Sequence, residues 1–253
     1  MPREGRVRKV GLARALSKLG YCSRSQGAEL IRAGRVQLNG ALRRDPETPA
    51  RPGQDRIAID GHAIDEQKKI YLMMNKPRGV VTTASDEKGR DTVYGVLEKI
   101  NDSLPWVAPV GRLDKASEGL LLLTNDSEWG ARIAAPETHL EKTYHVQIDK
   151  LVDQKFLHAI VNGVRVDGGE VLRAARVRLL RVGEKNCWLE IILDEGKNRQ
   201  IRRMLKPLGT EVLRLVRVAI GPLPLGELAK GAFRALTEEE KRMLDRAMRV
   251  RTS

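Results

Sequence analysis

One stretch decides the fold: GRLDKASEGLLLLTND, residues 111–126. Arg112 and Asp114 lie on a glycine-bounded loop, and the apolar run 120–124 that follows predicts a buried strand closed by Asn125-Asp126. Loops between rigid strands are where catalytic groups concentrate. For this segment alone, however, an Arg–Asp contact that closes a turn is the simpler interpretation.

The sequence on both sides of this stretch mixes strands with helices. Strands are expected at 71–77, 106–110, 142–148, 171–181, 188–193 and 211–220, and helices at 127–135, at 198–208 before Gly209, and after the capping box of Thr237 and Glu240. The strand–helix alternation of a doubly wound sheet is missing. We therefore predict an α+β domain whose largely antiparallel or mixed sheet is flanked by helices.

A second helical segment after Glu195 is strongly cationic. In GKNRQIRRML, residues 196–205, the residues Ile201 and Leu205 form an apolar stripe, which leaves Arg199, Arg202 and Arg203 on the flanking faces. The segment is either a solvated cationic helix, or it contacts phosphates and supplies a buried cation to a carboxylate. The residues alone leave both interpretations open.

The first 69 residues form a small basic module. They hold 15 Lys and Arg against 8 Asp and Glu. Leucines at helical spacing stop at Gly20, Ser23 and Gln26 make a capping box for a second helix, and Asn39-Gly40 is a hairpin turn. The module is therefore expected to be two short helices followed by a small β-unit.

Basic side chains punctuate both helices of the module and their exits. They are Arg14, Lys18, Arg24, Arg32 and Arg35. Two adjacent helices can present these cations to a phosphate backbone, and the alternative is an ordinary solvated face. Because Tyr21 is the one aromatic residue among them, backbone and shape recognition is favoured over base stacking.

Composition narrows the function class. The 253 residues carry a net charge of +13, which favours a polyanionic partner, most often nucleic acid. No apolar run approaches the ~20 residues that span a bilayer, and the basic start lacks the apolar segment of a secretory signal. Cys22 and Cys187 provide no disulfide framework or metal spacing. The expectation is a reduced, cytoplasmic protein with no membrane association, no metal site and no nucleotide-cofactor motif.

The basic module resembles the RNA-binding domain first described in ribosomal protein S-four. The resemblance rests on LSKLGYCSRS, residues 16–25, and IRAGRVQLNG, residues 31–40, and it covers residues 9–65. It implies structured RNA, chiefly ribosomal, as the partner.

The rest of the chain resembles the pseudouridine synthases of the RsuA/RluB/RluE/RluF family. Three motifs occur in the family's order, namely residues 111–126, EKTYHV at 141–146, and residues 195–205. The resemblance implies a catalytic domain at 70–245 that breaks the N1–C1′ bond of a uridine, rotates the uracil and rejoins it through C5 without a cofactor.

The same resemblance assigns roles to individual residues. Asp114 would be the catalytic carboxylate, and Arg202 its basic partner, with Lys197 a second candidate for that role. Arg112 would help extrude the uridine, and Tyr144 would stack on the base. Arg199 and Arg203 would contact the RNA. Whether Asp114 attacks the base, attacks the ribose or acts in a glycal route stays open.

The leading hypothesis is a monomeric enzyme that isomerises one uridine in a hairpin or loop of ribosomal RNA, with large-subunit RNA preferred over small-subunit RNA. The alternative is a ribosome-assembly factor that binds RNA and whose isomerase activity is lost or secondary. A DNA-binding regulator has little support, because the sequence shows no clear recognition helix.

Overall fold

The computed structural model describes residues 8–83, 89–99 and 104–248. They group into two compact units. Unit 1 holds residues 1–71, 103–108 and 123–131, and unit 2 holds residues 72–102, 109–122 and 132–253. The limits expected from the sequence, 9–65 and 70–245, stay a prediction.

Unit 1 contains the basic module, which has the expected helix–helix–β order. Helices α1 (Leu12–Lys18) and α2 (Arg24–Arg32) pack on the sheet β3-β2-β5-β6, and β1 (Val10–Gly11) pairs with β4 (Pro49–Ala50). The sheet strands are β2 (Val36–Leu38), β3 (Ala41–Arg43), β5 (Ile57–Ile59) and β6 (His62–Ile64). Both hydrogen bonds of the Ser23–Gln26 capping box form, and Asn39-Gly40 turns the β2–β3 hairpin with positive φ at both residues.

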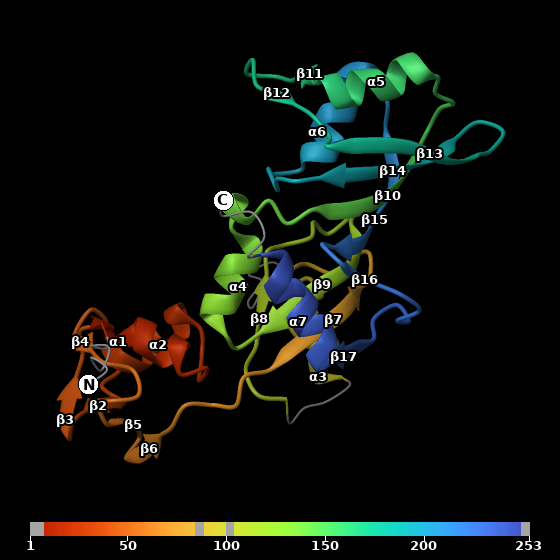
Figure 1. The fold of residues 1–253 in the computed structure, drawn as a ribbon. Helices are drawn as coiled ribbons and strands as arrows, with labels where there is room; N and C mark the ends of the chain where they lie inside the picture. Colours follow the sequence, from red (N-terminus) through yellow and green to blue (C-terminus); the bar gives the residue numbers. More distant parts are fainter. Residues whose placement is uncertain (1–7, 84–88, 100–103, 249–253) are drawn as a thin grey trace. The chain divides into compact units, whose positions relative to one another are not determined.

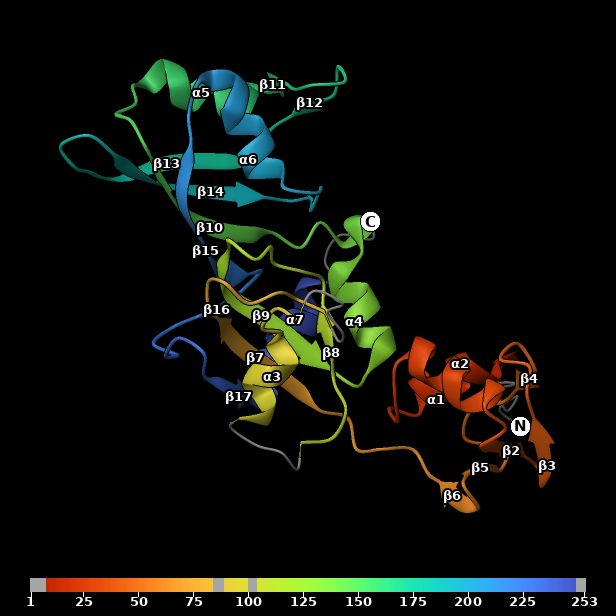
Figure 2. The same ribbon diagram turned by 180° about the vertical axis from the view of Figure 1, so that it is seen from behind.

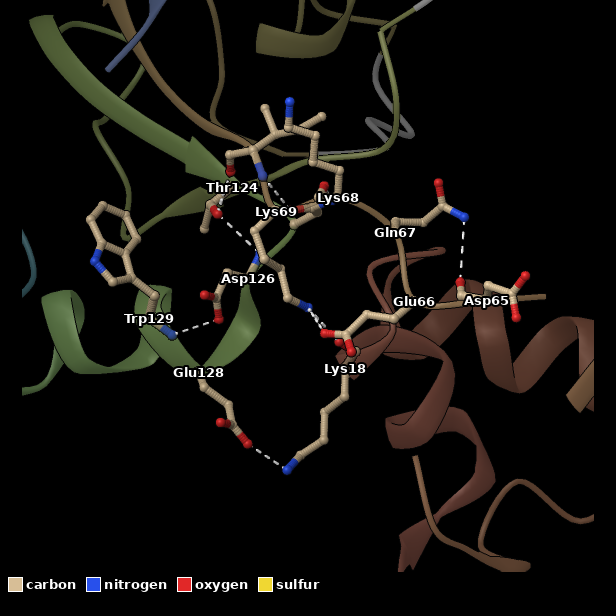
Figure 3. A network of polar contacts seen from close by, with 12 residues as sticks. Lys18, Asp65, Glu66, Gln67, Lys68, Lys69, Thr124, Asp126, Glu128 and Trp129 are labelled. Atoms are coloured by element: carbon tan, nitrogen blue, oxygen red, sulfur yellow. Dashed lines mark hydrogen bonds and ion pairs between the residues drawn. The ribbon is translucent and has the colours of Figure 1, made fainter. Parts of the chain in front are cut away.

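Residues 65–71 are tied to residues 124–129 within the same unit (Figure 3). The fully buried amide of Asn125 accepts from the Ile70 nitrogen at 2.8 Å and donates to the Lys68 carbonyl at 2.9 Å. Lys69 bonds the carbonyl of Lys18, whose own ammonium pairs with Glu128. Residues 65–71 are therefore held in place by a buried side chain.

Unit 2 is built on a mixed sheet in the order β13-β14-β10-β15-β9-β7-β17 (Figure 1). The strands are β7 (Tyr71–Lys76), β9 (Glu118–Thr124), β10 (Lys142–Ile148), β13 (Arg176–Val182), β14 (Cys187–Leu193), β15 (Val212–Ile220) and β17 (Phe233–Ala235). The short strands β8 (Ala108–Val110) and β16 (Leu223–Pro224) pair with β9 and β15. Pairs along β13, β14, β10 and β15 are antiparallel, whereas β15 and β9 are parallel. The prediction of an α+β fold with a mixed sheet is confirmed.

Two helices cover one face of the strands β10, β14 and β15. Helices α5 (Gln154–Asn162) and α6 (Gln200–Leu205) lie beside these strands in both views (Figures 1 and 2). Ile160 and Met204 are fully buried against Val146, Leu189 and other apolar residues of the sheet. The remaining helical elements are α3 (Val93–Glu98), α4 (Ser127–Ala134), α7 (Glu238–Ala247) and the single turns 136–138 and 206–208.

Some predicted elements differ from the structure. The strand expected at 171–181 is two strands, because β12 (Val171–Leu172) forms a hairpin with β11 (Val164–Arg165), and the chain then changes partner and pairs with β14. The helix expected at 198–208 begins at Gln200 and tightens into a 3₁₀ turn at Lys206. Helix α5 was not predicted, although its N-cap, Asp153, accepts from the Phe156 nitrogen as a capping signal should.

The pairing of β9 with β15 depends on Gly119. This residue lies opposite Arg217 with φ of +102°, a backbone angle that residues other than glycine rarely adopt. A Cβ atom at this position would overlap the Arg217 carbonyl oxygen and lie 2.8 Å from the Arg217 nitrogen. The backbones of β9 and β15 approach this closely only because residue 119 has no side chain.

We expect Gly119→Ala to lower the free energy of unfolding by about 3 kcal/mol or more, because overlap with backbone atoms adds to the strain at positive φ. The matched control is Gly226→Ala, where φ is +60° and nothing lies within 4 Å of an added Cβ, so a loss of about 1 kcal/mol is expected. Urea denaturation measures both. Equal losses of unfolding free energy in the two variants would show that the close approach of the two backbones does not contribute to stability.

Candidate active site

The loop that carries Asp114 is tethered by several other segments. The Thr82 hydroxyl bonds both the nitrogen and the carbonyl of Leu113, and the Gly79 nitrogen donates to Lys115. Arg202 donates to the Ala116 carbonyl at 3.4 Å. The loop's own Ser117 nitrogen donates to the Asp114 carbonyl at 2.9 Å. These bonds hold the backbone on both sides of Asp114, which is what a precisely placed reactive group requires.

A buried lysine adds a further tether. Lys76, at the end of β7, is fully buried and donates to the carbonyls of Ser117 and Pro77 at 2.8 and 3.0 Å. Burial lowers the pKa of Lys76 to about 8, against the opposing effect of Glu118 and Asp114. The Lys76 ammonium therefore holds the end of the Asp114 loop through the Ser117 carbonyl.

Asp114 opens onto a cavity of about 480 Å³ in unit 2, a size typical of small-ligand sites. Leu193, Leu215 and Ile220 supply apolar walls beside Tyr144. Basic residues outnumber acidic ones in the lining. The basic residues are Arg112, Lys142, Lys197, Arg199, Arg202 and Arg217, and the acidic ones are Asp114 and Glu195. This excess of positive charge suits an anionic ligand.

The ion pair of Asp114 is with Arg199, at 3.6 Å between Nη1 and Oδ2. Arg199 is the N-cap residue directly before α6 and has a left-handed backbone conformation, with φ of 48°. Arg202 instead bonds the carbonyls of Val212 and Ala116. Burial lowers the pKa of the Arg202 guanidinium, Arg199 lowers it further, and Asp114 opposes this. The Asp114 carboxylate thus lies near both Arg199 and Arg202. Its ion pair is with Arg199, the residue that was predicted to contact RNA.

The other predicted active-site residues take different positions. Tyr144 lines the cavity from β10, opposite Arg217 on β15, and Arg112 lines it as an exposed side chain. Lys197 also lines it, but its ammonium pairs with Glu195 and Glu170 rather than with Asp114. Hydrogen bonding to Glu195 raises the pKa of Lys197. The cavity therefore brings together all the residues proposed for chemistry, but it gives Lys197 other partners.

The predicted RNA-binding cations divide into two groups. Arg14, Arg24 and Arg32 are exposed and, among the described residues, form no ion pair. Lys18, Arg35, Arg199 and Arg203 each pair with a carboxylate of this chain, on Glu128, Asp60, Asp114 and Glu170 respectively. The partners lie 25 to 110 residues from their cations, so spacing alone gives no signal of them.

Arg217 and Lys142 line the cavity and were not among the predicted site residues. Arg217 lies in β15 and Lys142 begins β10, both within segments that the sequence predicts only to be strands. No pattern separates either residue from an ordinary strand cation. Their position became visible only when β10, β15 and the Asp114 loop came together.

Within residues 8–83, 89–99 and 104–248, no group of three or more His, Cys, Asp or Glu side chains is placed to hold a metal ion. In the same ranges, no helix has the length and apolarity needed to cross a bilayer.

Comparison with known proteins gives the family. Residues 70–206 match the model of the RNA pseudouridylate synthases, and residues 10–66 match the S4 domain. A relative from Aquifex aeolicus, named an RNA pseudouridine synthase, is 36% identical over 241 residues, which covers 95% of each chain. The chain belongs to the RNA pseudouridine synthases.

Two further comparisons agree with this family. The ribosomal large subunit pseudouridine synthase B of Bacillus subtilis is 32% identical and covers 92% of this chain and 94% of its own. A crystal structure of a pseudouridylate synthase matches with a TM-score of 0.64 and 28% identity over 93% of this chain and 99% of that one. The resemblance read from the three motifs, and the enzyme class that it implied, are confirmed.

The buried Lys76 predicts a pH dependence of stability. Between pH 8 and its ordinary pKa of 10.5, the unfolded chain binds a proton at Lys76 that the folded chain does not. The contribution of Lys76 to the free energy of unfolding is therefore flat below pH 8 and rises above it, by at most about 1.4 kcal/mol per pH unit.

The measurement is the difference in unfolding free energy between the wild-type protein and Lys76→Met from pH 7 to 10. Lys155→Met, at an exposed lysine of α5, is the matched control and should show no rise over this range. A flat difference for Lys76→Met would contradict the buried, neutralised lysine.

Proposed function

We propose that this pseudouridine synthase converts a uridine of ribosomal RNA into pseudouridine, with Asp114 as the catalytic carboxylate. The observation that carries the proposal is the cavity itself: one tethered aspartate, one aromatic side chain and an excess of cations share a space large enough for a nucleotide. The positive lining suits the phosphates of RNA, and Tyr144 offers a ring on which a base can stack.

Three observations support ribosomal RNA as the substrate. The chain carries an S4 domain at its N-terminal end, its net charge is +13, and one relative is named for the ribosomal large subunit. We therefore favour large-subunit RNA over small-subunit RNA, and a hairpin or loop as the target. We further propose that the enzyme acts as a monomer in the cytoplasm.

Each residue of the cavity has a role in the proposed reaction. Asp114 meets the reacting nucleotide, and Arg199 and Arg202 supply positive charge on either side of it. Tyr144 stacks on the base, and the exposed Arg112 helps to replace the extruded uridine in its stack. Arg203 and Lys197 act at the edge of the site through their pairs with Glu170.

The first test is release of tritium from position 5 of uridine in ribosomal RNA transcripts, followed by mapping of pseudouridine in cells with and without the gene. We expect Asp114→Asn to lower tritium release at least about a thousandfold, because the substitution removes the reacting charge and keeps the shape. RNA affinity should change by less than about twofold.

Asp167→Asn is the matched control, because its side chain is 97% exposed and lies outside the cavity lining. Full activity of Asp114→Asn would overturn the catalytic assignment. A wild-type protein that binds ribosomal RNA tightly but releases no tritium would instead favour an assembly factor.

The module makes a separate prediction. Replacing Arg14, Arg24 and Arg32 together by Gln removes three exposed cations that form no ion pair with the described residues. The slope of log affinity against log salt concentration should then fall by about 2, since each phosphate contact contributes about 0.7 to 0.9. Arg242→Gln, at an exposed arginine of α7, should leave the slope unchanged. Equal slopes for the triple variant and this control would contradict an RNA-binding role of the three arginines.

A further inference from the structure

Two arginines of the cavity have donors that nothing in the described chain satisfies. Three buried side-chain nitrogens lack a hydrogen-bond partner among the described residues, and they are Trp106 Nε1, Arg202 Nε and Arg217 Nη2. Arg202 and Arg217 both line the cavity around Asp114. Because buried donors in proteins are nearly always paired, these two call for an acceptor that enters the cavity.

Arg217 is the more deeply buried of the two. It is 5% exposed, its Nε donates to the Leu120 carbonyl at 2.7 Å, and its backbone lies against Gly119. The guanidinium is therefore fixed on one side, and its unpaired Nη2 is buried. Within the described residues, Arg217 forms no ion pair, and burying an unpaired charge is costly.

Within the described residues, no carboxylate forms an ion pair with Arg217, although Asp194 acts on the neighbouring Lys142. Glu118, the buried acid on the neighbouring strand, is already bonded by Arg214 through two hydrogen bonds and by Lys230. The nearby Lys142 and Lys76 are cations, and Arg217 lowers the pKa of both beyond the effect of burial. The buried part of the site thus holds a local excess of positive charge.

The depth of Arg217 favours the base over the phosphate as its ligand. The exposed cations of the lining, Arg112, Lys197 and Arg199, are available to backbone phosphates near solvent. Arg217 instead lies directly across β10 and β15 from Tyr144, the residue expected to stack on the base. A base stacked on Tyr144 would therefore lie beside Arg217, and the groups of uracil that accept a hydrogen bond from an N–H donor are its carbonyl oxygens.

We infer that Arg217 is a substrate-binding residue that donates a hydrogen bond from Nη2 to a carbonyl oxygen of the target uracil. The inference rests on the proposed function. When the N1–C1′ bond breaks, its electron pair stays with the uracil, whose negative charge is shared by N1, O2 and O4. When C5 bonds to C1′, the ring supplies the electron pair of the new bond, C5 loses its proton to solvent, and N1 takes up a proton, so the uracil is neutral again. A fixed guanidinium at a carbonyl oxygen stabilises the charge in between.

The test combines a protein substitution with a substitution in the RNA. A transcript that carries the mapped target uridine is compared with transcripts that carry 2-thiouridine or 4-thiouridine there, because sulfur is a weak hydrogen-bond acceptor. Single-turnover pseudouridine formation is measured for the wild-type protein, Arg217→Met, Arg217→Lys and the control Arg181→Met. Arg181 is an exposed arginine of β13 that lies over Trp188, outside the cavity lining.

We expect Arg217→Met to slow the uridine reaction about a hundredfold with RNA affinity within about threefold of wild type, and Arg181→Met to match wild type. One thio-substitution should slow the wild-type protein at least about fivefold and slow Arg217→Met less than about twofold, since the contact is already lost. Should Arg217→Met not fold, Arg217→Lys is judged by the same criterion.

Three results would overturn the inference. The first is that the thiouridine substitutions slow Arg217→Met by the same factor as the wild-type protein, which would show that Arg217 acts structurally. Coupling to a methylphosphonate at the target phosphate, without coupling to either thiouridine, would assign Arg217 to the backbone. A wild-type protein that forms no pseudouridine in any ribosomal RNA would remove the proposed function, and this inference with it.

Discussion

The close approach of Gly119 to the backbone of Arg217 is the constraint on which the rest of the site depends. It joins β9 to β15, which pair in parallel. The Asp114 loop directly precedes β9 in the chain, and the Arg217 side chain on β15 lines the cavity. The spacing of two strands therefore sets the positions of both the Asp114 carboxylate and the buried Arg217 guanidinium, which line the same cavity.

Charged side chains act as part of the framework in this protein. Lys76 and Arg202 use their donors on backbone carbonyls of the Asp114 loop, and Glu118 at its end is held by Arg214 and Lys230. Burying such groups is unfavourable unless each finds a partner. Carbonyls of the Asp114 loop are partners of Lys76 and Arg202, so the hydrogen bonds that offset the cost of burial also hold this loop in place.

Local signals in the sequence predicted local structure well. The capping boxes at Ser23 and Thr237 and the turn at Asn39-Gly40 form as expected, because their hydrogen bonds join residues at most three apart. The prediction of a single strand at 171–181 was wrong because it depended on pairing between residues distant in the sequence. The two halves of this segment have different partners, and the change of partner is a long-range event that the apolar pattern does not record.

The sequence by itself determined the family, the α+β class, the buried run after Gly119 and the aspartate that precedes it, because these depend on order and spacing along the chain. Only the tertiary structure decided which charges meet. It placed Arg199 rather than Arg202 in contact with Asp114 and paired Lys197 and Arg203 with Glu170. It also left the Nη2 of Arg217, opposite Tyr144, without a partner among the described residues. Electrostatic energy depends on distance through space, and residues remote in sequence come within a few ångströms only after the strands have paired.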